Sequence, residues 1–211
     1  MSETMKAMAV RKYGKQPVEM IDLPVPEPGP EEVLVRVKAA SVNPVDFKTR
    51  DGDLKAVVKH KFPLVLGNDL AGVVEKVGKD VRNFKVGDKV YGRPGKNNMG
   101  TFAQYFAINQ YDIAFMPKNL DFVEAASIPL VGLTSYQAFH EIMHLKAGDK
   151  VLVEAGSGGI GTFAIQLGRV MGLHVATTVS EKGESLVRSL GADEIINYKQ
   201  QNFWDVLSNY D

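Results

Sequence analysis

Hydrophobic positions follow two different patterns on either side of residue 121. Before it, apolar stretches are short and are separated by glycine and proline, which predicts strands joined by turns. The clearest is 32–42, where Val33, Val35 and Val37 alternate with Leu34, Arg36 and Lys38. Further strands are predicted at 5–10, 18–22, 70–77, 89–91 and 100–108. Many short strands of this kind predict a β-barrel or sandwich.

After residue 121 the apolar positions recur with a longer period. Asp121 and Glu124 form a capping-box pattern that predicts a helix start, and Pro129 suits the first turn of a helix extending to about Lys146. From residue 150, strand and helix alternate. The strands are predicted at 151–153, 173–179 and 194–198, and the helices at 160–171, with Ile160, Ala164, Leu167 and Met171 on one face, and at 181–190. This order predicts a βαβαβ unit with a parallel sheet.

Composition and charge narrow the class of protein. The chain has 211 residues, 45% hydrophobic and 24% charged, with a formal net charge of zero. The chain lacks the excess of basic residues that would indicate nucleic-acid binding. It also has no apolar run long enough for a membrane helix. The first residues lack the basic-then-apolar pattern of a secretion signal, so a cytoplasmic location is expected. There is no cysteine, which excludes disulfides, thiolate metal ligands and a cysteine nucleophile.

A glycine-rich turn follows the predicted strand at 151–153. Gly156, Gly158 and Gly161 match the pattern G-x-G-x-x-G. In dinucleotide-binding folds the first glycine permits the tight turn, the second lets the backbone approach a pyrophosphate, and the third lets the helix pack on the strand. The helix start also offers unpaired N–H groups to the phosphates. We therefore expect residues Gly156, Ser157, Gly158, Gly159, Ile160 and Gly161 to bind a dinucleotide.

The end of the next strand distinguishes NAD from NADP. A carboxylate there would bind the ribose 2′-hydroxyl and repel a 2′-phosphate. The strand tip falls near Ser180, with Lys182 available to pair with a phosphate, which favours NADP(H). Glu181 is the opposing observation, because a shift of one residue would place a carboxylate at the tip.

The segment His140-Glu141-Ile142-Met143-His144 matches the zinc-peptidase pattern H-E-x-x-H. The predicted helix ends within a turn of His144, and the extended motif would need glycine and histidine where Ala147 and Lys150 stand. We therefore expect no metal site there.

In several motifs the chain resembles the medium-chain dehydrogenase/reductase superfamily. The segments that carry the resemblance are Ser41–Arg50, Gly67–Val74, Ala155–Gly161 leading into Ile165-Gln166-Leu167, and Leu190–Asp193 before Ile195–Tyr198. The resemblance implies a GroES-like, partly open β-barrel domain at residues 1–125 and a Rossmann parallel-sheet domain at 126–211.

Zinc alcohol dehydrogenases of that superfamily use an early cysteine and a Gly-His-Glu segment. Here Asn43 stands in the first region and Gly67-Asn68-Asp69 in the second. The pattern resembles the zinc-free quinone oxidoreductase branch, which includes zeta-crystallin-like and 2-alkenal reductases. This resemblance implies hydride transfer from NADPH to a quinone or an α,β-unsaturated carbonyl compound.

The resemblance also implies site residues. Ser180, Lys182, Tyr198 and Thr134 would join the glycine turn in cofactor binding. Asn43 would lie near the nicotinamide, Asp46 would orient neighbouring groups, and Lys48 would polarise a substrate carbonyl. Each of the last two is also consistent with a surface residue. No side chain stands out as the second proton donor, so solvent is expected to supply that proton.

Only 50 residues follow Gly161 (211 − 161), whereas a complete dinucleotide-binding fold has two βαβαβ halves. The length predicts that 126–211 is the N-terminal half of a Rossmann domain in a truncated chain. The parent enzyme is expected to be a homodimer. Two alternatives remain: an NADPH-binding protein without catalysis, such as a redox sensor or crystallin-like protein, and a methyltransferase, against which the barrel-like first half argues.

Overall fold

The computed structural model describes residues 3–95, 98–208 and 210. It divides into two compact units, Met1–Leu130 and Val131–Asp211. The first is rich in β-strands and the second alternates strands with helices, so the predicted fold class is confirmed in both.

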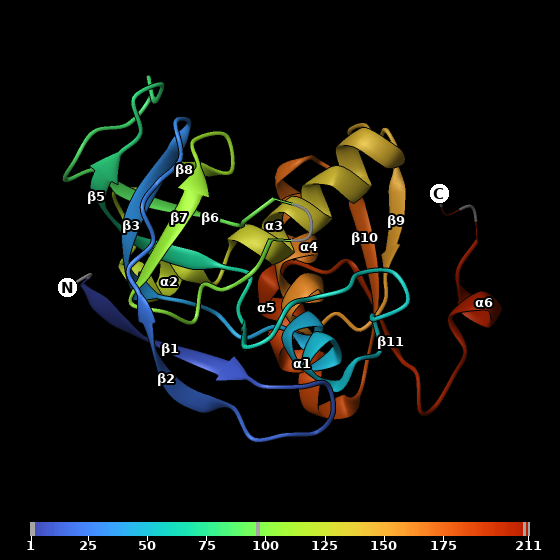
Figure 1. Cartoon of the computed structure of the whole chain (residues 1–211). Helices are drawn as coiled ribbons and strands as arrows, with labels where there is room; N and C mark the ends of the chain where they lie inside the picture. Colours follow the sequence, from blue (N-terminus) through green and yellow to red (C-terminus); the bar gives the residue numbers. More distant parts are fainter. Residues whose placement is uncertain (1–2, 96–97, 209, 211) are drawn as a thin grey trace. The chain divides into compact units, whose positions relative to one another are not determined.

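The first unit contains two antiparallel sheets (Figure 1). Five strands pair in the order β7-β3-β5-β6-β8, and three pair in the order β2-β1-β4. The outer strands β7 and β8 do not pair with each other, so the larger sheet is open and forms no closed barrel. The strands are β1 Thr4–Val10, β2 Glu19–Pro24, β3 Glu32–Ala39, β4 Leu64–Val65, β5 Leu70–Val77, β6 Lys89–Gly92, β7 Tyr105–Asn109 and β8 Ile113–Phe115.

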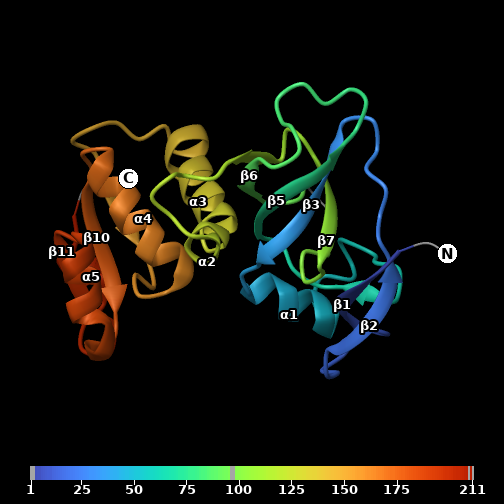
Figure 2. The ribbon, with the colours of Figure 1, turned by 90° about the vertical axis from the view of Figure 1, so that its left-hand side faces the viewer.

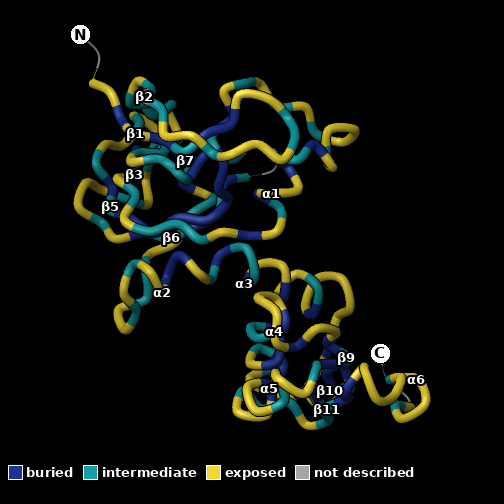
Figure 3. The backbone as a smooth tube through the Cα atoms, turned by 90° about the horizontal axis from the view of Figure 1, so that it is seen from below, coloured by how far each residue is buried: buried dark blue, intermediate teal, exposed yellow. Residues whose placement is uncertain are grey.

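Alternation along β3 builds the core of the larger sheet. Val33 and Val35 are fully buried against Leu70, Val90 and Ile108 from its neighbours. Successive side chains of a strand point to opposite faces, so the alternate valines share one face. Figure 3 shows buried residues along β3 and β5, the strands at the centre of this sheet.

Several predicted boundaries in the first unit were wrong. The strand expected at 32–42 ends at Ala39, because helix α1 (Pro44–Asp51) begins shortly afterwards with proline in its first turn. This helix was not predicted. The strand expected at 100–108 is confined to β7, and β4 and β8 were missed because runs of two or three residues carry no detectable period.

The second unit is a three-stranded parallel sheet with the order β11-β10-β9. Its strands are β9 Lys150–Val153, β10 His174–Val179 and β11 Glu194–Asn197, and its main helices are α4 Gly159–Val170 and α5 Glu184–Leu190. Both helices contact the sheet and each other (Figure 2). Buried residues from the strands and helices form one hydrophobic core. The predicted βαβαβ unit is therefore confirmed.

Helix α4 buries a face that only partly matches the one predicted. Ala164 is buried, and Leu167 and Met171 pack against the core as expected, but Ile160 is 45% exposed, and Gly161, Ile165 and Gly168 are buried in addition. A Cβ on Gly168 would lie 2.6 Å from Val175 Cγ2. The strand thus approaches α4 where its residues are smallest, and a period of apolar side chains does not reveal such a face.

The remaining helices are short. They are α2 Phe122–Ala126, which has the predicted capping box, α3 Pro129–Tyr136, and α6 Phe203–Val206. The helix expected to reach Lys146 instead changes into a π-helical segment, η1 (Gln137–Ile142). The helix expected at 181–190 begins with a 3₁₀ turn, η2 (Glu181–Gly183). Across the residues that the structure describes, no helix combines the length and apolar character needed to cross a membrane.

Candidate functional site

The glycine turn connects β9 to α4 in the second unit. A Cβ on Gly156 would collide with Thr177 Oγ1, and one on Gly161 would collide with the Ala155 carbonyl oxygen and lie 2.6 Å from Gly156 Cα. These neighbours are backbone atoms or a buried side chain, so they cannot easily move. Gly156 and Gly161 are thus required by close packing within the turn.

The outer part of the turn is open. Ser157, Gly158, Gly159 and Ile160 are exposed, and no side chain caps the start of α4. The first N–H groups of a helix have no partner within it, and together they attract an anion. Ala155 has a positive φ of 55°, which is strained for a residue other than glycine and which sequence reasoning did not anticipate. The exposed residues of the turn and the absent cap fit a dinucleotide pyrophosphate.

The structure brings the other predicted cofactor residues of the sheet to this turn. A Cβ on Gly183 would lie 2.9 Å from Ser157 Cβ, so the η2 turn, with Lys182 exposed on it, is adjacent. Ser180 directly precedes η2 at the end of β10. The Tyr198 N–H donates to the Val179 carbonyl at 3.3 Å, and its side chain is 58% exposed. All these residues gather at the carboxyl ends of the parallel strands.

Thr134 is exposed on α3. That helix is beside the turn, because a Cβ on Gly159 would lie 3.6 Å from Val131 Cγ1. No hydrogen bond within the described ranges joins Thr134 to the glycine turn.

A second group of polar residues is buried in the first unit, where α1 begins. Asp46 Oδ2 accepts a hydrogen bond from the Asn43 N–H at 2.7 Å, and Asp46 Oδ1 accepts one from Asn68 Nδ2 at 2.8 Å. Asn43, Asp46 and Asn68 are 7%, 2% and 6% exposed. Asp46 therefore caps the helix and also joins it to the loop before β5, which explains why a carboxylate is buried there.

Asp69 is the centre of this group. Its Oδ2 accepts from Ser41 Oγ and from Asn43 Nδ2, both at 2.6 Å, and its Oδ1 accepts from the Leu130 N–H at 2.8 Å. A carboxylate can only accept, so the NH₂ of Asn43 must face Asp69. The side-chain oxygen of Asn43, Oδ1, can then accept a hydrogen bond, either from an N–H group at the start of α1 or from a ligand. Asp69 and Ser41 were not among the predicted site residues.

Burial shifts the pKa values of both carboxyl groups, Asp46 and Asp69, in the same direction. It raises the pKa of Asp46, although hydrogen bonds from Asn43, Asn68 and Gly67 oppose the effect. It also raises the pKa of Asp69, against the donors just described and the positive charge of Arg93. Desolvation disfavours the charged form, so each carboxylate depends on its donors.

Lys48 is not brought into this group. It is exposed in the last turn of α1, and no hydrogen bond or ion pair among the described residues joins its amine to Asp46 or Asp69. Asn68 and Arg93 were missed as well. The segment Gly67-Asn68-Asp69 was a usable signal, because it stands where the zinc enzymes have Gly-His-Glu.

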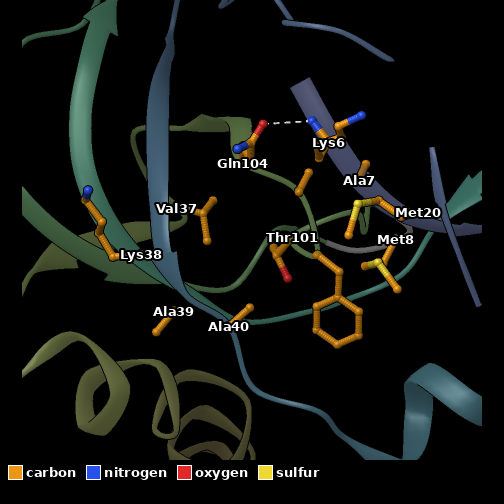
Figure 4. Close-up of a pocket in the computed structure, with 12 residues that line it drawn as sticks. Lys6, Ala7, Met8, Met20, Val37, Lys38, Ala39, Ala40, Thr101 and Gln104 are labelled. Atoms are coloured by element: carbon orange, nitrogen blue, oxygen red, sulfur yellow. Dashed lines mark hydrogen bonds between the residues drawn. The ribbon is translucent and has the colours of Figure 1, made fainter. Parts of the chain in front are cut away.

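A separate cavity of about 290 Å³ lies in the first unit (Figure 4). Its wall is largely apolar, and at its rim the Lys6 N–H donates to Gln104 Oε1 at 2.8 Å. It contains none of the predicted site residues. The lining residues are Lys6, Ala7, Met8, Met20, Val37, Lys38, Ala39, Ala40, Thr101, Phe102, Ala103 and Gln104.

The H-E-x-x-H segment does not form a regular helical face. His140 is in the π-helical segment and His144 follows it with a φ of 54°. His144 Nδ1 is 3.1 Å from the His140 carbonyl oxygen. In the part of the chain that the structure describes, no three histidine, aspartate or glutamate side chains form a group that could hold a metal ion.

Comparison with known proteins identifies relatives of this chain. Residues 29–118 match the alcohol dehydrogenase GroES-like domain. The chain is 40% identical to an NADPH-dependent alkenal/one oxidoreductase of Arabidopsis thaliana and 39% identical to a 2-methylene-furan-3-one reductase of Solanum lycopersicum. Each match covers 98% of this chain, but only 56% and 55% of the relative.

Solved structures show the same relationship. The quinone oxidoreductase of Coxiella burnetii superimposes with a TM-score of 0.87 at 37% identity, over 98% of this chain and 66% of that one. The chain belongs to the medium-chain dehydrogenase/reductase superfamily, in the branch that contains the quinone oxidoreductases and alkenal reductases.

Proposed function

We propose that this chain carries the NADPH-binding turn and substrate-binding residues of an oxidoreductase that reduces a quinone or an activated enone. The observation that carries the proposal is the glycine turn, in which a Cβ at Gly156 or Gly161 would collide with its neighbours while the helix start stays uncapped. The names of the relatives support the substrate class.

The second unit would hold the cofactor. The amides of Ser157, Gly159, Ile160 and Gly161 would bind the pyrophosphate, whereas the Gly158 N–H donates to the Ala155 carbonyl at 2.9 Å and shapes the turn. Tyr198 and Thr134 would add contacts. Ser180 and Lys182 favour the 2′-phosphate of NADP(H), with Glu181 as the opposing charge. Lys182 is exposed and has no ion-pair partner within the described ranges, so its ammonium is available to a phosphate.

The first unit would bind the substrate. When bound, NADPH supplies the hydride. Asn43 would accept a hydrogen bond from an N–H or O–H group near the nicotinamide, Asp46 would hold Asn43 in place, and Lys48 would approach a carbonyl from its exposed position. Solvent would supply the proton. We propose zinc-independent chemistry, because asparagine replaces the cysteine of the zinc enzymes at position 43 and thiolate ligands are absent from the sequence.

In this proposal residues 1–125 form the substrate domain and 126–211 the first half of the NADP-binding domain. The cytoplasmic location and the homodimeric parent enzyme stay predictions, and two plant relatives are named chloroplastic.

Fluorescence titration with NADPH and NADH, followed by a panel of quinones and short enones, tests the proposal. We expect saturable NADPH binding that is tighter than NADH binding, and oxidation of NADPH by at least one acceptor when the chain is joined to the remainder of a relative's nucleotide-binding domain. Binding without oxidation by any acceptor in that chimera would favour the non-catalytic alternative. No NADPH binding, together with binding of S-adenosylmethionine, would favour the methyltransferase.

A further inference from the structure

Asp69 and Arg93 lie at the same end of a strand pair, directly before β5 and directly after β6. Strands β5 and β6 are antiparallel, and Leu70 pairs with Gly92 as their last register partners. Extending this register by one position would place Asp69 opposite Arg93. Opposed residues of an antiparallel pair direct their side chains to the same face. The guanidinium of Arg93 is therefore on the side of the sheet where Asp69 binds Asn43.

The charge of Arg93 acts on Asp69 without an ion pair between them. The positive charge of Arg93 lowers the pKa of Asp69, against the larger effect of burial. The two Asp69 oxygens, however, already accept from Ser41, Asn43 and the Leu130 N–H. Among the residues with described positions, Arg93 forms no salt bridge.

Arg93 also has an unsatisfied donor. Its Nε is buried and has no hydrogen-bond partner among the described residues, whereas its backbone N–H donates to the Asp112 carbonyl at 3.2 Å. Leaving a buried donor of a charged group unpaired is costly, and such groups are rare in native proteins. A ligand oxygen that accepts from the guanidinium would give this charged group a partner.

We propose that Arg93 binds the carbonyl oxygen of the substrate and so selects compounds in which that oxygen becomes negatively charged. This inference rests on the proposed function. When hydride adds to the β-carbon of an enone, a new C–H bond forms and the C=C electron pair shifts, so that the carbonyl oxygen holds the negative charge until water protonates the product. In a quinone the charge likewise moves to an oxygen. A guanidinium stabilises such an oxygen by charge-assisted hydrogen bonds.

The neighbouring groups are less suited to this role. Asn43 directs its NH₂ to Asp69, so it offers an acceptor to a ligand and not a donor. Lys48 is exposed, and among the described residues no hydrogen bond or ion pair joins it to the buried group, so this inference assigns the carbonyl oxygen to Arg93 in place of Lys48. Arg93 is the cation that acts on the Asp69 carboxyl group.

4-Nitrophenol tests the proposal, because its neutral and anionic forms differ in colour and the anion imitates the charged oxygen. The unaltered chain should bind 4-nitrophenolate at least tenfold more tightly than 4-nitrophenol, with or without NADPH. Arg93→Gln should weaken phenolate binding by about 10- to 100-fold, as expected for a hydrogen bond to a charged group. Arg93→Lys should restore part of the affinity.

Arg82→Gln is the matched control, because Arg82 is exposed in the same unit and the substitution removes the same charge. It should bind phenolate as the unaltered chain does. Equal phenolate affinity in Arg93→Gln and Arg82→Gln would overturn the proposal, as would equal affinity of the unaltered chain for the two forms. Circular dichroism shows whether each variant folds, and if Arg93→Gln does not, the Arg93→Lys comparison decides. NADPH titration of the same proteins reports separately on the cofactor site, so failure of the proposed function and failure of this inference give different results.

Discussion

Replacing Gly161 by alanine tests the packing that shapes the cofactor turn. The new Cβ would collide with the Ala155 carbonyl oxygen and would lie 2.6 Å from Gly156 Cα and 2.8 Å from the Gly156 carbonyl carbon. Each of these atoms belongs to the backbone, so the start of α4 must move away from β9. Overpacking of this kind costs about 1–3 kcal/mol, while alanine in place of glycine within a helix returns about 1 kcal/mol.

The expected net loss for Gly161→Ala is about 0–2 kcal/mol in the free energy of unfolding. Gly159→Ala is the control, since its Cβ would meet only Val131 Cγ1 at 3.6 Å, an ordinary contact. We expect that variant to be unchanged or more stable by up to about 1 kcal/mol. Moving the turn should also weaken NADPH binding in Gly161→Ala by about tenfold, corresponding to about 1.4 kcal/mol.

Urea unfolding followed by the fluorescence of Trp204 measures the stability, because this residue is the one tryptophan in the sequence and belongs to the second unit. Equal unfolding free energies for the two variants would refute the packing argument. Lower stability with unaltered NADPH affinity would refute the link between the packing and the cofactor site.

The remaining predictions concern charges. Asp69→Asn should lower the unfolding free energy by about 1–3 kcal/mol, since the buried donors lose a charged acceptor, whereas Asp53→Asn on the exposed surface should have little effect; urea titrations of both compare them directly. Burial raises the pKa of Asp46 above its unfolded value, so the folded state binds the proton more tightly and the contribution of Asp46 to stability falls as pH rises from about 4 through the raised pKa. The unaltered chain should therefore lose stability relative to Asp46→Asn over that window, and parallel stability curves would contradict the assignment. Lys182→Ala should reduce the preference for NADPH over NADH by about threefold to tenfold, an effect typical of an exposed ion pair; titration with both nucleotides measures it, and an unaltered ratio would show that Lys182 does not contact the 2′-phosphate.

The alternation of strand, turn and helix after Lys150 was sufficient to predict the parallel unit and its glycine turn. Those features depend on residues close together in the sequence. A buried strand is recognised from a run of apolar residues, and the turn is recognised from glycines at a fixed spacing. The gathering of Gly156–Gly161, Ser180 and Tyr198 follows too, because the carboxyl ends of neighbouring parallel strands meet at one edge of a sheet.

Tertiary contacts alone decided the buried polar group of the first unit. Asp69 is 26 residues from Asn43 and 28 from Ser41, and it meets them only because the tertiary structure brings the loop before β5 to the segment before α1. The face that α4 buries was decided in the same way, by where β10 approaches small residues. Local sequence determines which segments form strands, turns and helices, because periodicity and backbone preference act over a few residues. Packing between distant segments determines which donors reach a buried carboxylate, since a charge inside a protein is stable only where the fold brings it enough partners.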